Sequence, residues 1–192
     1  MKNQQGLTLI ELMTTIAIVA VLAAVAIPSF TSMTAQNRMV GGLNDLVADL
    51  HYARSEAIKR GRNVVVCIAN RRFSNCRSGS ADWSLGWIVR DPGDSTVTPR
   101  IRASVLRVHA ALDGDDSMTE TDKPSGASSG KITFSRNGFS TDARTIKMCE
   151  PTNTASKARA FIITTTGHIH TGYDSDDDGI VESGSGDNVT CS

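Results

Sequence analysis

The chain has 192 residues, which is enough for one domain of ordinary size. Its 20 lysine and arginine residues balance its 20 aspartate and glutamate residues, which excludes a globally basic nucleic-acid-binding protein and a globally acidic disordered chain. Hydrophobic residues make up 40% of the sequence, so a hydrophobic core can form. The charges are unevenly spread, because they nearly vanish close to the N-terminus and aspartates gather close to the C-terminus.

Residues 7–27 form an apolar run with a single charged side chain, Glu11. A helix of this length roughly spans the ~30 Å hydrocarbon core of a bilayer. Lys2 is the only charged side chain before the run, so the positive-inside rule places the N-terminus in the cytoplasm. A secretory signal peptide and a plain membrane anchor are alternatives. Neither explains the glutamate, which costs about 3 kcal/mol in the span unless it is paired.

The sequence GLTLIEL at residues 6–12 resembles the processing motif of type IV pilins and type II secretion pseudopilins. The resemblance implies that a prepilin peptidase cuts between Gly6 and Leu7, removing residues 1–6 as a leader, and that the new amine of Leu7 is N-methylated. The family usually has phenylalanine at the position of Leu7. The resemblance also implies an assembly role for Glu11. Its carboxylate would pair with the Leu7 amine of a neighbouring subunit and so neutralise two charges in an apolar bundle.

The helical pattern continues beyond the membrane-length run. Apolar residues recur at three- and four-residue steps from Met39 to Ile58, and a cationic last turn with a glycine stop follows at residues 59–61. We therefore predict one helix from Thr8 to Arg60. By resemblance to the pilins, Pro28 marks a kink in it with a role in assembly.

After residue 61 the pattern becomes that of β-strands, separated by clusters of Gly, Ser, Asn and Asp. We expect residues 112–130 to form a long polar loop. The order of elements predicts the α+β class: a long N-terminal helix, half membrane-spanning and half amphipathic, packed on an antiparallel β-sheet head of type IV pilin-like architecture. The predicted strands are residues 63–68, 87–90, 101–108, 131–134, 145–148 and 160–165.

The resemblance narrows in the head. The sequence LVADLHYARSEAIKR at residues 46–60 is similar to the helix of the pseudopilin H group and of the FimT and FimU minor pilins, and FSRNG at residues 134–138 fits the same group. This implies a membrane-spanning or filament-core helix at residues 7–30 and a periplasmic or surface-exposed head at residues 31–192, with an acidic tail at residues 173–192.

The implied function is that of a minor pilin or pseudopilin, a structural subunit of a type IV pilus or of a type II secretion pseudopilus. The two systems use the same helix and the same processing, so both stay open. The implied partners are other pilins or pseudopilins, the prepilin peptidase and the assembly platform of the bacterial inner membrane. We expect a single-pass inner-membrane protein with the head in the periplasm, and later in the filament.

Four cysteines in a domain predicted to lie outside the cytoplasm indicate two disulfides. Of the three pairings, we prefer Cys67–Cys76 with Cys149–Cys191, because the first closes a short loop beside a strand and the second fixes the C-terminal tail. A zinc site is the rival interpretation, but the sequence has no C-x-x-C pair and histidine is sparse. We find no phosphate loop, G-x-S-x-G or H-E-x-x-H motif, and expect neither enzymatic activity nor a catalytic cofactor.

A pilus-borne DNA receptor for natural transformation is the alternative function. Residues 38–107 hold 12 lysine and arginine residues against 6 acidic ones, and the candidate phosphate contacts are Arg71, Arg72 and Arg77. Some FimT-type minor pilins bind DNA through a G-R-x-R element. Here His168 and His170 replace both arginines, which weakens binding at pH 7 and makes it acid-dependent. A solvated cationic face or a subunit contact are the other interpretations.

The tail contains carboxylates at alternate positions, Asp174, Asp176 and Asp178, followed by Gly179 and then by Glu182. Hard oxygen ligands at this spacing resemble the start of a Ca²⁺-binding loop, although Ser185 stands where an EF-hand has its bidentate glutamate. Calcium binding and an acidic solvated loop both remain open from the sequence.

Overall fold

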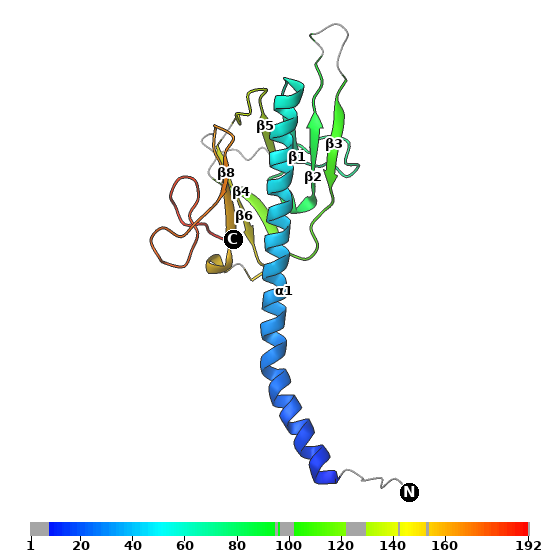
Figure 1. Cartoon of the computed structure of the whole chain (residues 1–192), viewed down its shortest axis with the longest axis vertical. Helices are drawn as coiled ribbons and strands as arrows, with labels where there is room; N and C mark the ends of the chain where they lie inside the picture. Colours follow the sequence, from blue (N-terminus) through cyan, green and yellow to red (C-terminus); the bar gives the residue numbers. More distant parts are fainter. Residues whose placement is uncertain are drawn as a thin grey trace. The chain divides into compact units, whose positions relative to one another are not determined.

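The structure is a computed structural model that describes residues 8–94, 96, 102–121, 130–141, 143–152 and 154–191. Gly6 and Leu7, at the predicted cleavage site, lie outside these residues, as does the side chain of Pro28. The chain divides into two compact units, Met1–Asn37 and Arg38–Ser192. The helix α1, Leu9–Arg60, contributes to both (Figure 1).

In the first unit, α1 is apolar and uncovered. Thr8 begins it as an N-cap, since its hydroxyl accepts a hydrogen bond from the Glu11 amide at 3.3 Å. The large apolar side chains from Leu9 to Met33 are exposed, as is Glu11. Within the described part of the chain, α1 is the one helix that is long and apolar enough to cross a membrane.

In the second unit, α1 buries one face. Gly41 and Gly42 lie within the uninterrupted helix. Gly42 lets the Leu112 side chain approach the helix closely, because a Cβ at Gly42 would lie 3.2 Å from that side chain. Gly61 follows α1 with φ +65°, the left-handed conformation expected for a glycine helix stop. The buried face comprises Met39, Leu43, Leu46, Leu50, Ala53 and Ala57.

Two antiparallel four-stranded sheets accompany the helix, whereas the sequence pattern predicts one antiparallel sheet. The first sheet has the order β3-β2-β1-β5, and the second has the order β4-β6-β7-β8. Strands β4 and β8 were not predicted, and β4 lies within the segment expected to be a loop. The strands are β1 Val64–Ile68, β2 Trp87–Asp91, β3 Ser104–His109, β4 Ser117–Thr121, β5 Lys131–Phe134, β6 Arg144–Cys149, β7 Arg159–Ile163 and β8 Ile169–Thr171. Short 3-10 helices cover Trp83–Leu85 and Ala155–Lys157.

One hydrophobic core joins the second half of α1 to both sheets. Its largest side chains include Trp83 and Trp87, which are fully buried. A smaller cluster lies on the other face of the first sheet, under the loop closed by Cys67–Cys76. The C-terminal tail makes a third cluster with the second sheet, in which Val189 packs with Ala160 and Cys149. The tail is therefore a packed layer of the head.

Candidate functional site

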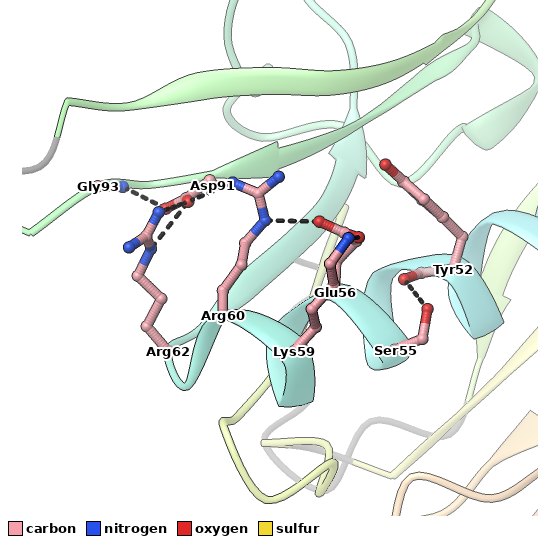
Figure 2. A network of polar contacts seen from close by, with 8 residues as sticks. All are labelled: Tyr52, Ser55, Glu56, Lys59, Arg60, Arg62, Asp91 and Gly93. Carbon is pink, nitrogen blue, oxygen red and sulfur yellow. Dashed lines mark hydrogen bonds and ion pairs between the residues drawn. The ribbon is translucent and has the colours of Figure 1, made fainter.

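The end of α1 is tied to the end of β2 by a network of charges (Figure 2). The Asp91 side chain is fully buried and accepts hydrogen bonds from Arg60 Nη1 at 3.2 Å, from Arg62 Nε at 2.8 Å and Nη2, and from the Gly93 amide at 2.8 Å. Glu56 in turn accepts from Arg60 Nε at 2.6 Å. Arg60 therefore links two carboxylates that are far apart in the sequence.

This network lowers the pKa of both carboxyls. Burial opposes ionisation of Asp91, but the hydrogen bonds from Arg62 and Gly93 outweigh it and hold the pKa of that carboxyl below its ordinary value. The hydrogen bond from Arg60 lowers the pKa of the Glu56 carboxyl in the same way. Both groups are therefore anions in the folded head at neutral pH.

A second buried carboxylate, Asp49, connects α1 to β2 and β3. Its two oxygens accept hydrogen bonds from Trp87 Nε1 at 2.8 Å and Arg107 Nη1 at 2.7 Å. The Arg107 guanidinium also lies 4.1 Å from the ring centre of Tyr52 on α1. The Trp87 indole stacks on His109 with ring centres 3.9 Å apart. These contacts fix the register of the helix against the first sheet.

Two arginines of α1 hold loops of the head. Arg38 makes a bidentate ion pair with the buried Asp116, at 2.6 and 3.0 Å. Arg54 donates to the carbonyls of Gly138 at 3.0 Å and Thr166 at 3.3 Å, so that it binds the turns after β5 and β7. The helix is thus joined by polar contacts to both sheets, as a scaffold that presents rigid loops would require.

The predicted basic contacts lie on the loop after β1. Arg71, Arg72 and Arg77 are exposed. The loop is closed by the Cys67–Cys76 disulfide, with a Cα–Cα distance of 5.5 Å. His168 and His170 belong instead to the β7–β8 hairpin of the second sheet. The two groups of predicted DNA-contacting residues are therefore carried by different sheets.

The acidic loop, residues 174–182, brings together three of the four predicted calcium ligands. Ligand oxygens of Asp174, Asp176 and Glu182 lie within 4.8 Å of one another, while Asp178 is outside the group. Glu182 accepts hydrogen bonds from Ser175 N at 2.9 and 3.0 Å and from Ser175 Oγ at 2.7 Å, and these bonds lower the pKa of its carboxyl. The same oxygens that would bind Ca²⁺ thus also stabilise the loop, and calcium binding stays a prediction.

The sequence predicts a disulfide that fixes the tail, but not the packing of the tail on the second sheet. The Gly184 amide donates to Thr145 Oγ1 at 2.8 Å, and Lys147 Nζ donates to the Thr190 carbonyl. The Cys149–Cys191 disulfide, with a Cα–Cα distance of 5.8 Å, fastens the end of the tail. Between the tail and strands β7 and β8 lies a cavity of about 420 Å³, lined by residues that include His170, Tyr173 and Glu182.

Comparison with known proteins decides the family. The family model of the type II transport protein GspH matches residues 43–167, which is more than half of the chain. The chain belongs to the GspH family. The model of the prokaryotic N-terminal methylation motif matches residues 1–27 of this GspH-family protein. The resemblance noted in the sequence is thereby confirmed for both the N-terminus and the head.

Individual relatives agree with this assignment. Two curated fimbrial proteins of Pseudomonas aeruginosa are each 42% identical over 65 residues, or 34% of this chain, and the match spans 42% of each relative. The crystal structure of the Pseudomonas aeruginosa type IV minor pilin FimU has a TM-score of 0.53 at 22% identity, with 73% of this chain and 92% of that chain covered. The GspH-family chain therefore has the fold of that minor pilin.

The boundaries of the family match separate shared from individual features. The match begins on the second half of α1 and ends at Gly167 in the β7–β8 turn. The charge network of Glu56, Arg60, Arg62 and Asp91 and the basic loop after β1 lie inside the matched range. The two histidines, the acidic loop and the packed tail of this GspH-family chain follow it.

Proposed function

We propose that the chain is a minor pilin or pseudopilin, a structural subunit that is stored in a membrane and then packed into a filament. One observation carries the proposal. Along the single helix α1, the large apolar side chains from Leu9 to Met33 are uncovered, whereas the second half buries Met39, Leu43 and Leu46 in a hydrophobic core. An exposed apolar helix of this length requires lipid or other helices around it.

Glu11 gives this helix a means of setting its register. Its carboxylate is exposed in an otherwise apolar segment, where an unpaired charge is unfavourable in lipid and in a helical bundle. Pairing with the Leu7 amine of a neighbouring subunit neutralises both groups. The match of residues 1–27 to the methylation motif supports the processing at Gly6 and Leu7 that creates this amine.

We propose the finer assignment by analogy with the family. The residues 1–6 act as a leader, residues 7–30 as the membrane and filament helix with Pro28 as its kink, and the remainder as the head. The subunit is non-catalytic and enters a type IV pilus or a type II secretion pseudopilus. Its partners are other pilins, the prepilin peptidase and the inner-membrane assembly platform, with the N-terminus in the cytoplasm and the head in the periplasm.

Intact-mass analysis of the membrane-extracted chain tests the processing on which this function depends. Expressed with the peptidase, the chain should lose the mass of residues 1–6 and gain one methyl group. Without the peptidase, it should keep its full mass. A Gly6→Val variant should stay unprocessed, because a branched side chain stands where the peptidase needs glycine.

A second glycine provides the matched control. Gly41→Ala changes an exposed helical glycine whose added Cβ has nothing within 4 Å, so this variant should be processed like the wild type. Retention of residues 1–6 in the wild-type protein when the peptidase is present would be incompatible with the proposed function. Processing that proceeds equally without the peptidase would also be incompatible with it.

A further inference from the structure

The hairpin between β7 and β8 carries two histidines whose imidazole rings lie side by side. His168 and His170 flank Ile169, which is buried against the core. Alternate residues of an extended segment point to the same face, so the two histidines share the face opposite to Ile169. Their ring centres are 5.6 Å apart, and the ring planes are tilted by 38°. The family match ends directly before this pair.

The ring nitrogens are available for binding. His170 Nδ1 lies 3.3 Å from the Thr171 carbonyl oxygen. A carbonyl can only accept, so Nδ1 is the donor in this contact, which leaves Nε2 as the nitrogen for a metal ion. A hydrogen bond of this kind fixes the tautomer of metal-binding histidines in general. The His168 ring is exposed and has no hydrogen-bond partner among the residues that the structure describes.

The spacing of the rings fits a shared metal ion. Zinc binds histidine nitrogen at about 2.0–2.1 Å with tetrahedral angles, so two imidazoles on one ion have ring centres about 5 Å apart. The observed distance between the ring centres is 5.6 Å, and a small rotation of the side chains can remove the difference. Neutral imidazole is a preferred ligand of Zn²⁺ and Cu²⁺, whereas Ca²⁺ prefers oxygen ligands.

The surroundings favour a cation and leave room for further ligands. His170 lines the cavity of about 420 Å³ beneath the tail, together with Tyr173 and the carboxylate of Glu182. Ser175 of the acidic loop lines the same cavity. The negative potential of that loop raises the local concentration of cations. The cavity beside His170 has room for water molecules.

We propose that His168 and His170 form a chelating site for a divalent transition-metal ion, Zn²⁺ or Cu²⁺, on the β7–β8 hairpin of the second sheet. The two imidazoles supply two ligands, and the remaining positions stay open to water or to an outside donor. The site is separate in its chemistry from the calcium loop considered from the sequence, since nitrogen and not oxygen holds the ion. It does not depend on which filament the subunit enters.

Copper and zinc binding to the untagged, metal-stripped full-length chain in detergent tests the proposal. With one equivalent of CuCl₂, electron paramagnetic resonance should show coupling to two imidazole nitrogens, and titration calorimetry with ZnCl₂ should give one site. His168→Gln and His170→Gln should each leave one coupled nitrogen and weaken zinc binding about 100-fold or more. The double variant should lose the site.

His51 offers a matched control, because it is an exposed histidine on α1. His51→Gln should keep both the spectrum and the zinc affinity. An Asp174→Asn/Asp176→Asn variant should keep the two-nitrogen signal, and tryptophan fluorescence should confirm that each variant is folded. A wild-type copper spectrum without imidazole coupling would overturn the proposal. So would zinc binding that survives in the double histidine variant and disappears in the aspartate variant.

Discussion

Arg62, the second residue after the end of α1, donates two hydrogen bonds to the buried carboxylate of Asp91 at the end of β2. The pair spans 29 residues of sequence and joins the helix end to the first sheet. Because the Asp91 side chain is fully buried while the Arg62 side chain is 27% exposed, solvent screens the ion pair only in part.

Asp91→Asn should destabilise the head by about 2–3 kcal/mol, because it removes the buried charge that pairs with Arg60 and Arg62. The two arginines are partly exposed, so water can solvate them in the variant. Urea unfolding of the detergent-solubilised chain measures this effect, and fluorescence reports on the head alone since both tryptophans, Trp83 and Trp87, lie in it. Asp45→Asn, at a side chain 61% exposed, is the control and should change stability by no more than about 0.5 kcal/mol. Equal losses in the two variants would contradict this role for Asp91.

Acid should weaken the head through the same carboxylates. The folded-state pKa values of Glu56 and Asp91 are lowered, so their contribution to stability is fully present above the ordinary carboxyl pKa of about 4 and is lost as pH falls through the folded values. The urea concentration at the unfolding midpoint of the wild type should therefore fall as the pH is lowered below about 4. The Asp91→Asn variant should show a shallower drop, and superimposable pH profiles would argue against the charge network of Asp91 as the cause.

The two disulfides should differ in their contribution to the free energy of unfolding. Cys149–Cys191 closes 42 residues and Cys67–Cys76 closes 9. In the chain-entropy view, replacing the first pair by serine costs about 4 kcal/mol and replacing the second about 2.5 kcal/mol. Urea unfolding gives the order. Limited proteolysis should in addition cut the tail only when the first pair is missing, and the reverse order of stability would contradict the tail's role as a packed layer.

The DNA-receptor alternative makes its own prediction. If the basic loop contacts phosphates, filter binding of duplex DNA to the detergent-solubilised chain should be detectable at low salt and pH 6 and should weaken steeply as salt is raised. Arg71→Ala/Arg72→Ala should abolish it, whereas Arg136→Ala, at an exposed arginine in the turn after β5, should not. Absence of binding by the wild type under these conditions eliminates the alternative.

Much of the fold was predictable because its signals are local. The apolar periodicity gave a helix from Thr8 to Arg60, and the structure has α1 at Leu9–Arg60 with Thr8 as its cap. Six predicted strands overlap observed ones, and the structure contains the disulfide pairing preferred from the sequence. β-Branched runs and a glycine stop need no knowledge of distant residues.

The parts that were not predicted depend on distant partners. Strand β4 has the polar sequence SMTET and is stabilised by pairing with β6, and β8 is a three-residue edge strand that pairs with β7. Asp49, Asp91 and Asp116 look like surface residues in the sequence, yet each is buried with an arginine 29 to 78 residues away. No spacing rule connects such pairs. The packing of the tail over the second sheet depends in the same way on contacts that only the folded chain makes.

Incorporation into filaments tests the central claim most directly. The amount of this chain in sheared pili or in an overexpressed pseudopilus should be measured by immunoblot for the wild type, Glu11→Ala and the head control Asp45→Asn, at equal levels in the membrane. The proposed function predicts that the wild type and Asp45→Asn enter filaments and that Glu11→Ala stays in the membrane. A wild-type chain absent from both filaments, or Glu11→Ala incorporated as efficiently as the wild type, would contradict it.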